Sequence, residues 1–143
     1  MSNRTEAIEK LANDWYAALD THEPTPTLVA MLDTADLRMV FPEATLTGVE
    51  SFVGWYEGVI RIFFDEVHSV QSVTVNALRG DEADMTVAVR WEASRWNPPA
   101  AKSERIRLIA YQTWTVRFDA AGQPKIKTYT VDRLDYLPGS ATL

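Results

Sequence analysis

The chain of 143 residues contains no cysteine and only two histidines. Without cysteine there is no disulfide framework, cysteine nucleophile or thiolate metal site, and the composition suits a reducing cytoplasm. The two histidines lie far apart, without carboxylates nearby at ligand spacing, so a zinc or iron site is not expected. No glycine-rich loop has the spacing and the lysine of a phosphate-binding loop. We therefore expect neither a metal nor another cofactor.

Long apolar runs and an excess of positive charge are also missing. No segment approaches the roughly 20 apolar residues of a membrane span, and the first ten residues lack the apolar core of a signal peptide. We therefore expect a soluble, cytoplasmic protein without a membrane partner. The formal net charge of −6 argues against a nucleic acid as a partner, because its phosphate backbone is also negative.

What the chain does have is the size of one domain and many aromatic residues. Its hydrophobic content of 46% suits a globular fold with a real core. No internal repeat or low-complexity segment divides the sequence, so we expect a single domain over residues 1–143. Five Trp, five Tyr and five Phe are an unusual number for so short a chain. Their positions become important below.

The first part of the sequence indicates helices. Apolar residues recur at helical spacing and predict an inward face with Ile8, Leu11 and Trp15, opposite a polar side. Thr25 with Pro26 predicts the start of a short helix. Thr47 and Glu50 predict a capping box for a longer one. The expected helices cover residues 4–21, residues from 25 onward, and residues 47 to about 64, with short extended pieces at 37–41 and 44–46.

From His68 onward the apolar period changes to two, which indicates strands. Helices first and an antiparallel sheet last predict an α+β fold. Because the two middle strands are long, the sheet should be strongly curved and should wrap around the helices. The four expected strands cover residues 72–78, 83–96, 103–118 and 125–136.

The alternation in the two long strands predicts which face points inward. Met85, Val87, Val89 and Trp91 share one face of the first strand, and this face should pack on the helices. In the second strand Gln112 is the polar residue in an otherwise apolar row. Two interpretations remain open for it: a core amide with satisfied hydrogen bonds, or a hydrogen-bonding group of a pocket.

The opposite face is charged, but it also carries Ile109 and Tyr111. A second subunit packed on the sheet would cover these two residues, which predicts a homodimer. Isolated apolar residues on a surface are common, so this prediction depends mainly on the family resemblance described next.

Four segments carry a resemblance to a known family. They are "WYAALD" at 15–20, "FPEATLTGVESFVGWYEGV" at 41–59, "FFDEVHSVQSVTV" at 63–75 and "VRFDAAGQPKIKTYTVDRLDY" at 116–136. In this order they resemble the NTF2-like superfamily and, within it, the SnoaL-like (polyketide cyclase-like) proteins. The resemblance implies a cone of the NTF2-like (cystatin-like) type, with N-terminal helices packed on a highly curved antiparallel sheet. It also implies a pocket for an apolar small molecule, and a homodimer formed through the sheet.

The catalytic groups of ketosteroid isomerases, which share this fold, are largely absent. The aspartate base that precedes the proline of the first turn is matched here by Phe41. The tyrosine and the protonated aspartate of the isomerase oxyanion hole are matched by Trp15 and Trp114. Tryptophan can donate one hydrogen bond but cannot accept a proton, so isomerase chemistry of that kind is not expected. Glu43, beyond the turn, should lie at the rim or in solvent.

Other members use histidine: dehydratases combine Tyr, Asp and His groups, and SnoaL-type cyclases use an Asp with a His. His22, beside Glu23 and Pro24, is expected to be solvent-exposed. His68 has two interpretations: a structural residue at a helix–strand junction, or an acid–base group that faces the pocket. Histidine is suited to the second role because its ordinary pKa lies near neutrality.

Two functions therefore remain open. The first is a lyase, isomerase or cyclase that acts by proton transfer on an apolar cyclic or aromatic substrate, with His68 as the catalytic candidate. The second is a non-catalytic ligand-binding, accessory or dimerisation module. Convergence of His68 with Gln112, Tyr129 or Arg133 on an open cavity would favour the enzyme, whereas mutual packing of the indoles would favour the module. The expected pocket residues are Trp15, Phe41, Trp55, Trp91, Gln112, Trp114, Tyr129 and Arg133.

Overall fold

Helices occupy the first part of the chain and long strands the second in the structure, a computed structural model that describes residues 2–143. The helices are α1 (Ser2–Asp20), α2 (Thr25–Val29) and α3 (Val49–Ile62). The strands are β1 (Arg38–Val40), β2 (Thr45–Thr47), β3 (Phe63–Arg79), β4 (Glu82–Arg95), β5 (Glu104–Phe118) and β6 (Pro124–Tyr136). This arrangement confirms the predicted α+β class.

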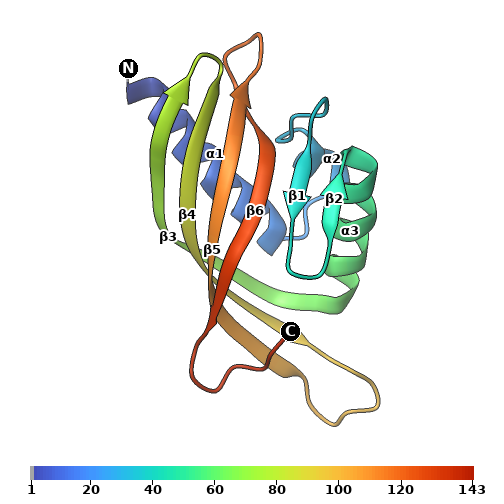
Figure 1. Cartoon of the computed structure of the whole chain (residues 1–143). Coiled ribbons are helices and arrows are strands. Elements are labelled where there is room, and N and C mark those ends of the chain that lie inside the picture. The colour runs from blue at the N-terminus through green and yellow to red at the C-terminus, as the bar shows by residue number, and fades with distance from the viewer. Residues whose placement is uncertain (1) are drawn as a thin grey trace.

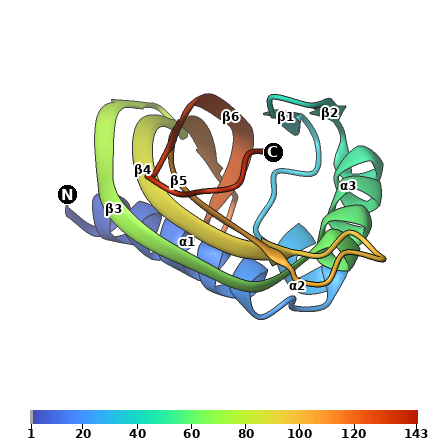
Figure 2. The same ribbon diagram turned by 90° about the horizontal axis from the view of Figure 1, so that it is seen from below.

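All six strands form one sheet in the order β2-β1-β6-β5-β4-β3. Neighbouring strands are antiparallel except β1 and β6, which are parallel. Figure 1 shows that the four long strands run side by side across α1, while β1, β2 and α3 lie together beyond β6. The view from below in Figure 2 shows how strongly the long strands curve around the helices. Three register shifts between β3 and β4 contribute bends, because a bulge kinks its strand.

The concave face of the sheet and one side of α1 form the core. Ile8, Leu11 and Trp15 are buried on α1, and Met85, Val87 and Val89 are buried on β4. The predicted inward faces of these two elements are therefore confirmed. Burial of one such aliphatic side chain contributes about 1.5–3 kcal/mol, so this shared face is a main source of stability.

The predicted start of β3 and end of α3 are wrong. The helix ends at Ile62 and β3 begins at Phe63, whereas the sequence predicted helix to about residue 64, a strand period only from His68 and a strand over residues 72–78. Residues 63–70 pair with residues 89–95 of β4. This pairing satisfies the hydrogen-bonding needs of the backbone N–H and C=O groups in a segment whose apolar periodicity is ambiguous. The contacts with β4 therefore override the local sequence pattern.

The predicted helix caps are also wrong. The N-cap of α2 is Pro24 and that of α3 is Gly48, and neither makes a side-chain capping hydrogen bond. Thr47 remains in β2, where it pairs with Arg38. The chain then turns at Gly48, whose φ of 86° favours glycine, and this turn removes Thr47 from the capping position.

No helix in residues 2–143 is long and apolar enough to cross a membrane.

Ile109 and Tyr111 lie half-buried on the outer face of β5, and the guanidinium carbon of Arg133 lies 4.1 Å from the centre of the Tyr111 ring. The homodimer through this face stays a prediction.

An ionic cluster joins the segment before β1 to the far end of the sheet. The guanidinium of Arg117 donates hydrogen bonds to Asp33 and Asp36 at 2.8 Å each, and to Glu82 at 3.1 Å. Lys127 adds a bond to Glu82 at 2.7 Å. Arg117 holds the pKa of Asp36 below its ordinary value, and Lys127, together with Arg117, does the same for the pKa of Glu82.

Arg117→Met should lower the melting temperature at neutral pH and make it less sensitive to acid. The lowered carboxyl pKa values mean that the cluster stabilises the fold above about pH 4, the ordinary carboxyl range, and that this contribution is lost as the pH falls through the folded-state values. Thermal unfolding between neutral and acidic pH measures the effect. Arg133→Met is the matched control, because the Arg133 side chain is 61% exposed and its ion pair with Asp135 is therefore weak. Equal acid sensitivity of Arg117→Met and wild type would contradict this role.

Candidate active site

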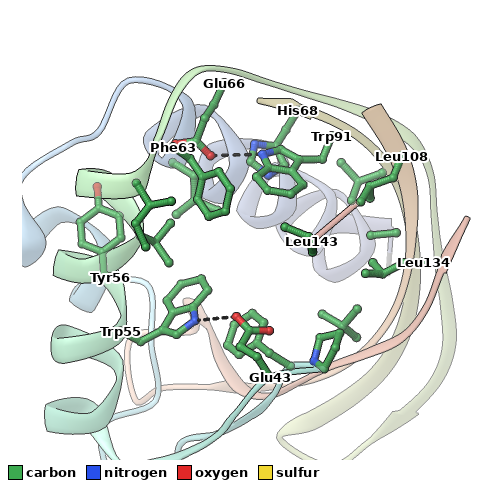
Figure 3. Close-up of a pocket in the computed structure, with 18 of the residues that line it drawn as sticks. Glu43, Trp55, Tyr56, Phe63, Glu66, His68, Trp91, Leu108, Leu134 and Leu143 are labelled. Carbon is green, nitrogen blue, oxygen red and sulfur yellow. Dashed lines mark hydrogen bonds between the residues drawn. The ribbon is translucent and has the colours of Figure 1, made fainter. Parts of the chain in front are cut away.

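A cavity of about 740 Å³ opens between the concave face of the sheet and α3. Its wall is mostly apolar and includes residues from α3 and all four long strands. Figure 3 shows side chains from the two sides of the molecule pointing toward this space. Six of the predicted residues line it: Phe41, Trp55, His68, Trp91, Gln112 and Tyr129.

Trp15 and Trp114, by contrast, do not line the cavity. Both are buried behind the cavity wall and pack near Tyr129. The ring centroid of Tyr129 is 6.0 Å from that of Trp15 and 5.1 Å from that of Trp114. They support the cavity wall instead of filling the space. The indoles therefore leave the cavity open, and His68, Gln112 and Tyr129 meet on it.

The predicted inward position of Arg133 is wrong. Tyr111 pairs with Arg133 in the sheet, whereas Gln112 pairs with Val131, so Asp132 is an extra residue in β6. This bulge exchanges the two faces of the strand beyond it. Arg133 consequently points outward and bonds Asp135 at 3.0 Å, and Leu134 takes the inward place on the cavity wall.

His68 is held by Asp20, the last residue of α1. Asp20 Oδ1 lies 2.6 Å from His68 Nδ1, and Oδ2 accepts the backbone N–H of His68 at 2.9 Å. An ionised carboxylate only accepts hydrogen bonds, so in the neutral imidazole this contact places the proton on Nδ1 and leaves the lone pair on Nε2. Nε2 has no hydrogen-bond partner within residues 2–143.

Sequence reasoning missed Asp20. It closes the "WYAALD" segment, and the Asp-with-His pairs of the SnoaL-type cyclases were a signal that could have found it. The two residues are 48 positions apart and meet only because α1 crosses the start of β3. Helical spacing alone does not specify that crossing.

Gln112 fits both of its predicted interpretations. Its Oε1 accepts hydrogen bonds from Tyr16 OH at 2.7 Å and from Trp114 Nε1 at 3.0 Å. These two donors fix the amide orientation, so the NH₂ group is the part that remains to donate. The Tyr16 ring in turn stacks on the imidazole of His68, with 5.0 Å between the centroids. Gln112 and His68 are therefore linked through one buried phenol.

Two buried phenols, Tyr16 and Tyr129, stay protonated. Burial raises the pKa of Tyr16 well above its ordinary value, and the nearby Tyr129 raises it further. Burial also raises the pKa of Tyr129. Tyr129 lines the cavity as a neutral phenol.

The expected solvent exposure of His22 is wrong. Its Nε2 pairs with Glu66 Oε2, and its side chain is 28% exposed. Glu66 Oε1 accepts a second hydrogen bond from Trp91 Nε1 at 3.1 Å. Residues beyond the end of α1 fold back against β3 here, so His22 meets a partner that its sequence neighbours do not indicate.

Phe41 takes part in the cavity wall as an aromatic surface. Its ring stacks on that of Trp55, with centroids 4.2 Å apart and planes inclined by 16°. Trp55 Nε1 donates to Glu43 Oε2 at 3.3 Å, and Glu43 is exposed, as expected for a rim residue.

Within residues 2–143 no group of three or more His, Asp or Glu side chains is placed to hold a metal ion.

Three of the five tyrosines should ionise late. Tyr16, Tyr56 and Tyr129 have pKa values above the ordinary value of about 10 because burial disfavours a phenolate. The unfolded chain releases these protons first, so stability should fall as the pH rises above about 10. Tyrosinate absorbance against pH measures this, and Tyr16→Phe should remove one late group. Ionisation of all five in a single step near the ordinary value would contradict the buried geometry.

No family model and no curated protein sequence matches the chain. Solved structures do match over most of its length. A proposed aromatic ring hydroxylase from Novosphingobium aromaticivorans has a TM-score of 0.83 at 17% identity, over 96% of this chain and 95% of that one. A hexachlorocyclohexane dehydrochlorinase, LinA type 2, has a TM-score of 0.77 at 15% identity, over 97% and 92%.

A proposed dehydratase of the NTF2-like family from Streptomyces avermitilis has a TM-score of 0.75 at 16% identity, over 96% of this chain and 98% of that one. Another match has a cystatin-like fold. These likenesses concern the arrangement of helices and strands, which is shared almost from end to end. The chain therefore has the NTF2-like, or cystatin-like, fold that its sequence predicts.

Proposed function

We propose that the protein is an enzyme that moves a proton on an apolar, cyclic or aromatic small molecule bound in this cavity. The observation that supports the proposal is the hydrogen-bonded pair of Asp20 and His68 on the cavity wall. The reaction class is that of a lyase, isomerase or cyclase, and His68 is the base.

The pair has the geometry that a general base needs. Asp20 fixes the imidazole through two contacts, one to Nδ1 and one to the backbone N–H of His68. Nε2 can then take a proton from substrate carbon, and the Asp20 carboxylate stabilises the imidazolium that forms. Only 10% of the His68 side chain is exposed, so little water competes for that nitrogen. A positioned base of this kind contributes about 10²–10⁴-fold to the rate.

Neighbouring donors can stabilise the charge left on the substrate. Gln112 and Tyr129 belong to the same wall as His68, and in this proposal the Gln112 NH₂ group and the Tyr129 hydroxyl are the donors. A substrate oxygen bonded to these groups would carry part of the negative charge as its C–H bond breaks. The remaining wall is apolar and aromatic, which suits a ring system.

The similar structures support the lyase form of the proposal. One is a dehydrochlorinase and another a proposed dehydratase, and both names denote eliminations. In such a reaction the C–H electron pair forms the new double bond while the leaving group departs. Phe41 stands where the isomerase resemblance would require a carboxylate base, and the wall carboxylates Glu43 and Glu66 each accept an indole N–H. His68, whose Nε2 has no hydrogen-bond partner among residues 2–143, is therefore the base in this proposal.

Binding and chemistry can be tested separately. A thermal-shift screen of apolar ring compounds should identify ligands, because a ligand at 100 times its Kd stabilises by about 2.7 kcal/mol. Each ligand is then incubated with the protein in D₂O, and mass spectrometry detects deuterium exchange, elimination or isomerisation. Ligands that bind without any such change would favour the non-catalytic module.

For a ligand that reacts, His68→Gln should lower kcat by about 10²–10⁴-fold and leave the ligand-induced melting shift largely intact. Asp20→Asn should also lower kcat, because an uncharged amide stabilises the imidazolium less well. Asp14→Asn is the control: it lies on the same helix, is exposed, and bonds only Lys10. Wild-type turnover in His68→Gln would remove His68 as the base.

A further inference from the structure

The cavity wall carries a buried carboxylate that the proposed proton transfer does not use. Glu66 lies on β3 close to His68, and only 5% of its side chain is exposed. One oxygen accepts from Trp91 Nε1 and the other pairs with His22 Nε2. A carboxylate offers about four lone-pair sites, so each oxygen can accept a further donor from the cavity.

A second carboxylate–indole pair stands on the other side of the space. Trp55 Nε1 donates to Glu43, as Trp91 Nε1 donates to Glu66. Figure 3 shows the two pairs facing each other across the cavity. An indole that donates its N–H to an anion becomes more electron-rich, which strengthens the attraction of its ring face for a cation.

The rings around these pairs form an aromatic enclosure. Phe41 stacks on Trp55, and the Phe63 ring meets that of Trp91 edge-on at 5.2 Å and 74°. All four rings line the same cavity. Aromatic walls combined with a carboxylate are the chemistry that recognises ammonium groups in proteins.

Apart from His68, the ionisable carboxyl side chains of the cavity wall give it a negative charge. Among the described residues that line the cavity there are two carboxylates, Glu43 and Glu66, and no lysine or arginine. The formal net charge of the chain, −6, has the same sign. An anionic ligand would be repelled by both carboxylates, whereas a cation would be attracted by them and by the ring faces.

We propose that the cavity selects a ligand that carries an ammonium group on an apolar body, and that Glu66 is the counter-ion of that group. The inference rests on the proposed function, because it names the ligand class of the same cavity. The ammonium group lies against the ring face of Trp91 and beside Glu66, and the apolar body extends toward Tyr129. His22 donates its Nε2 proton to the far oxygen of Glu66 and so holds the carboxylate toward the cavity.

Three matched compounds test this preference by calorimetry: 1-naphthylmethylamine, 1-naphthalenemethanol and 1-naphthoate, at about pH 8, where histidine is ordinarily neutral. The amine should bind at least about tenfold more tightly than the alcohol, and the carboxylate should bind most weakly. Glu66→Gln should weaken the amine about tenfold and change the alcohol by less than about twofold. Glu57→Gln is the matched control, because this exposed residue of α3 does not line the cavity.

Several results would overturn the inference. Equal or tighter binding of the alcohol or the carboxylate by the wild-type protein would do so without any variant. Equal weakening of the amine by Glu66→Gln and Glu57→Gln would show a general effect of net charge and no specific counter-ion. If the three compounds bind equally, the ammonium preference fails while the ligand-binding cavity of the proposed function stands. If none binds, neither the preference nor a cavity for such rings is supported.

Discussion

The hydrogen bonds between Asp20 and His68 join the end of the first helix to the first long strand. This contact serves both the fold and the candidate site. It fixes the place where α1 crosses the sheet, and it fixes the orientation of the His68 imidazole. A second pair, His22 with Glu66, lies beside it. In the first pair the carboxylate is at the helix end and the imidazole on the strand, whereas in the second the imidazole follows the helix end and the carboxylate is on the strand. Each pair places one group on the cavity wall: an imidazole from the first and a carboxylate from the second.

The cavity can stay open because the largest side chains pack behind its wall. Trp15 and Trp114 are buried against Tyr129, and Tyr16 fills the space between His68 and Gln112. Their burial supplies the stability that a hollow domain otherwise lacks. It also keeps these phenols neutral, because burial raises the pKa of both Tyr16 and Tyr129. The same packing therefore serves both stability and the proposed chemistry.

The sequence predicts whatever depends on local periodicity. The α+β class and the inward faces of α1 and β4 follow from apolar spacing, and both are confirmed. It fails where distant segments meet. Asp20 and His22 find partners 48 and 44 positions away, and the bulge at Asp132 turns Arg133 outward. Such contacts depend on where a helix crosses the sheet and on strand register. A bulge shifts the register by one residue, and the alternation of apolar residues in a single sequence does not reveal where a bulge occurs.

The proposed chemistry requires Asp20 to hold the His68 proton on Nδ1 and to leave Nε2 free to act as a base. Nitrogen-15 NMR of the imidazoles tests it directly, because the chain has only two histidines and Asp20→Asn and His22→Gln assign their signals. We expect that, in the neutral state, His68 is the Nδ1–H tautomer and that its Nδ1 proton is protected from exchange by the bond to Asp20. A His68 ring in the Nε2–H form, or in rapid exchange between both forms, would contradict it.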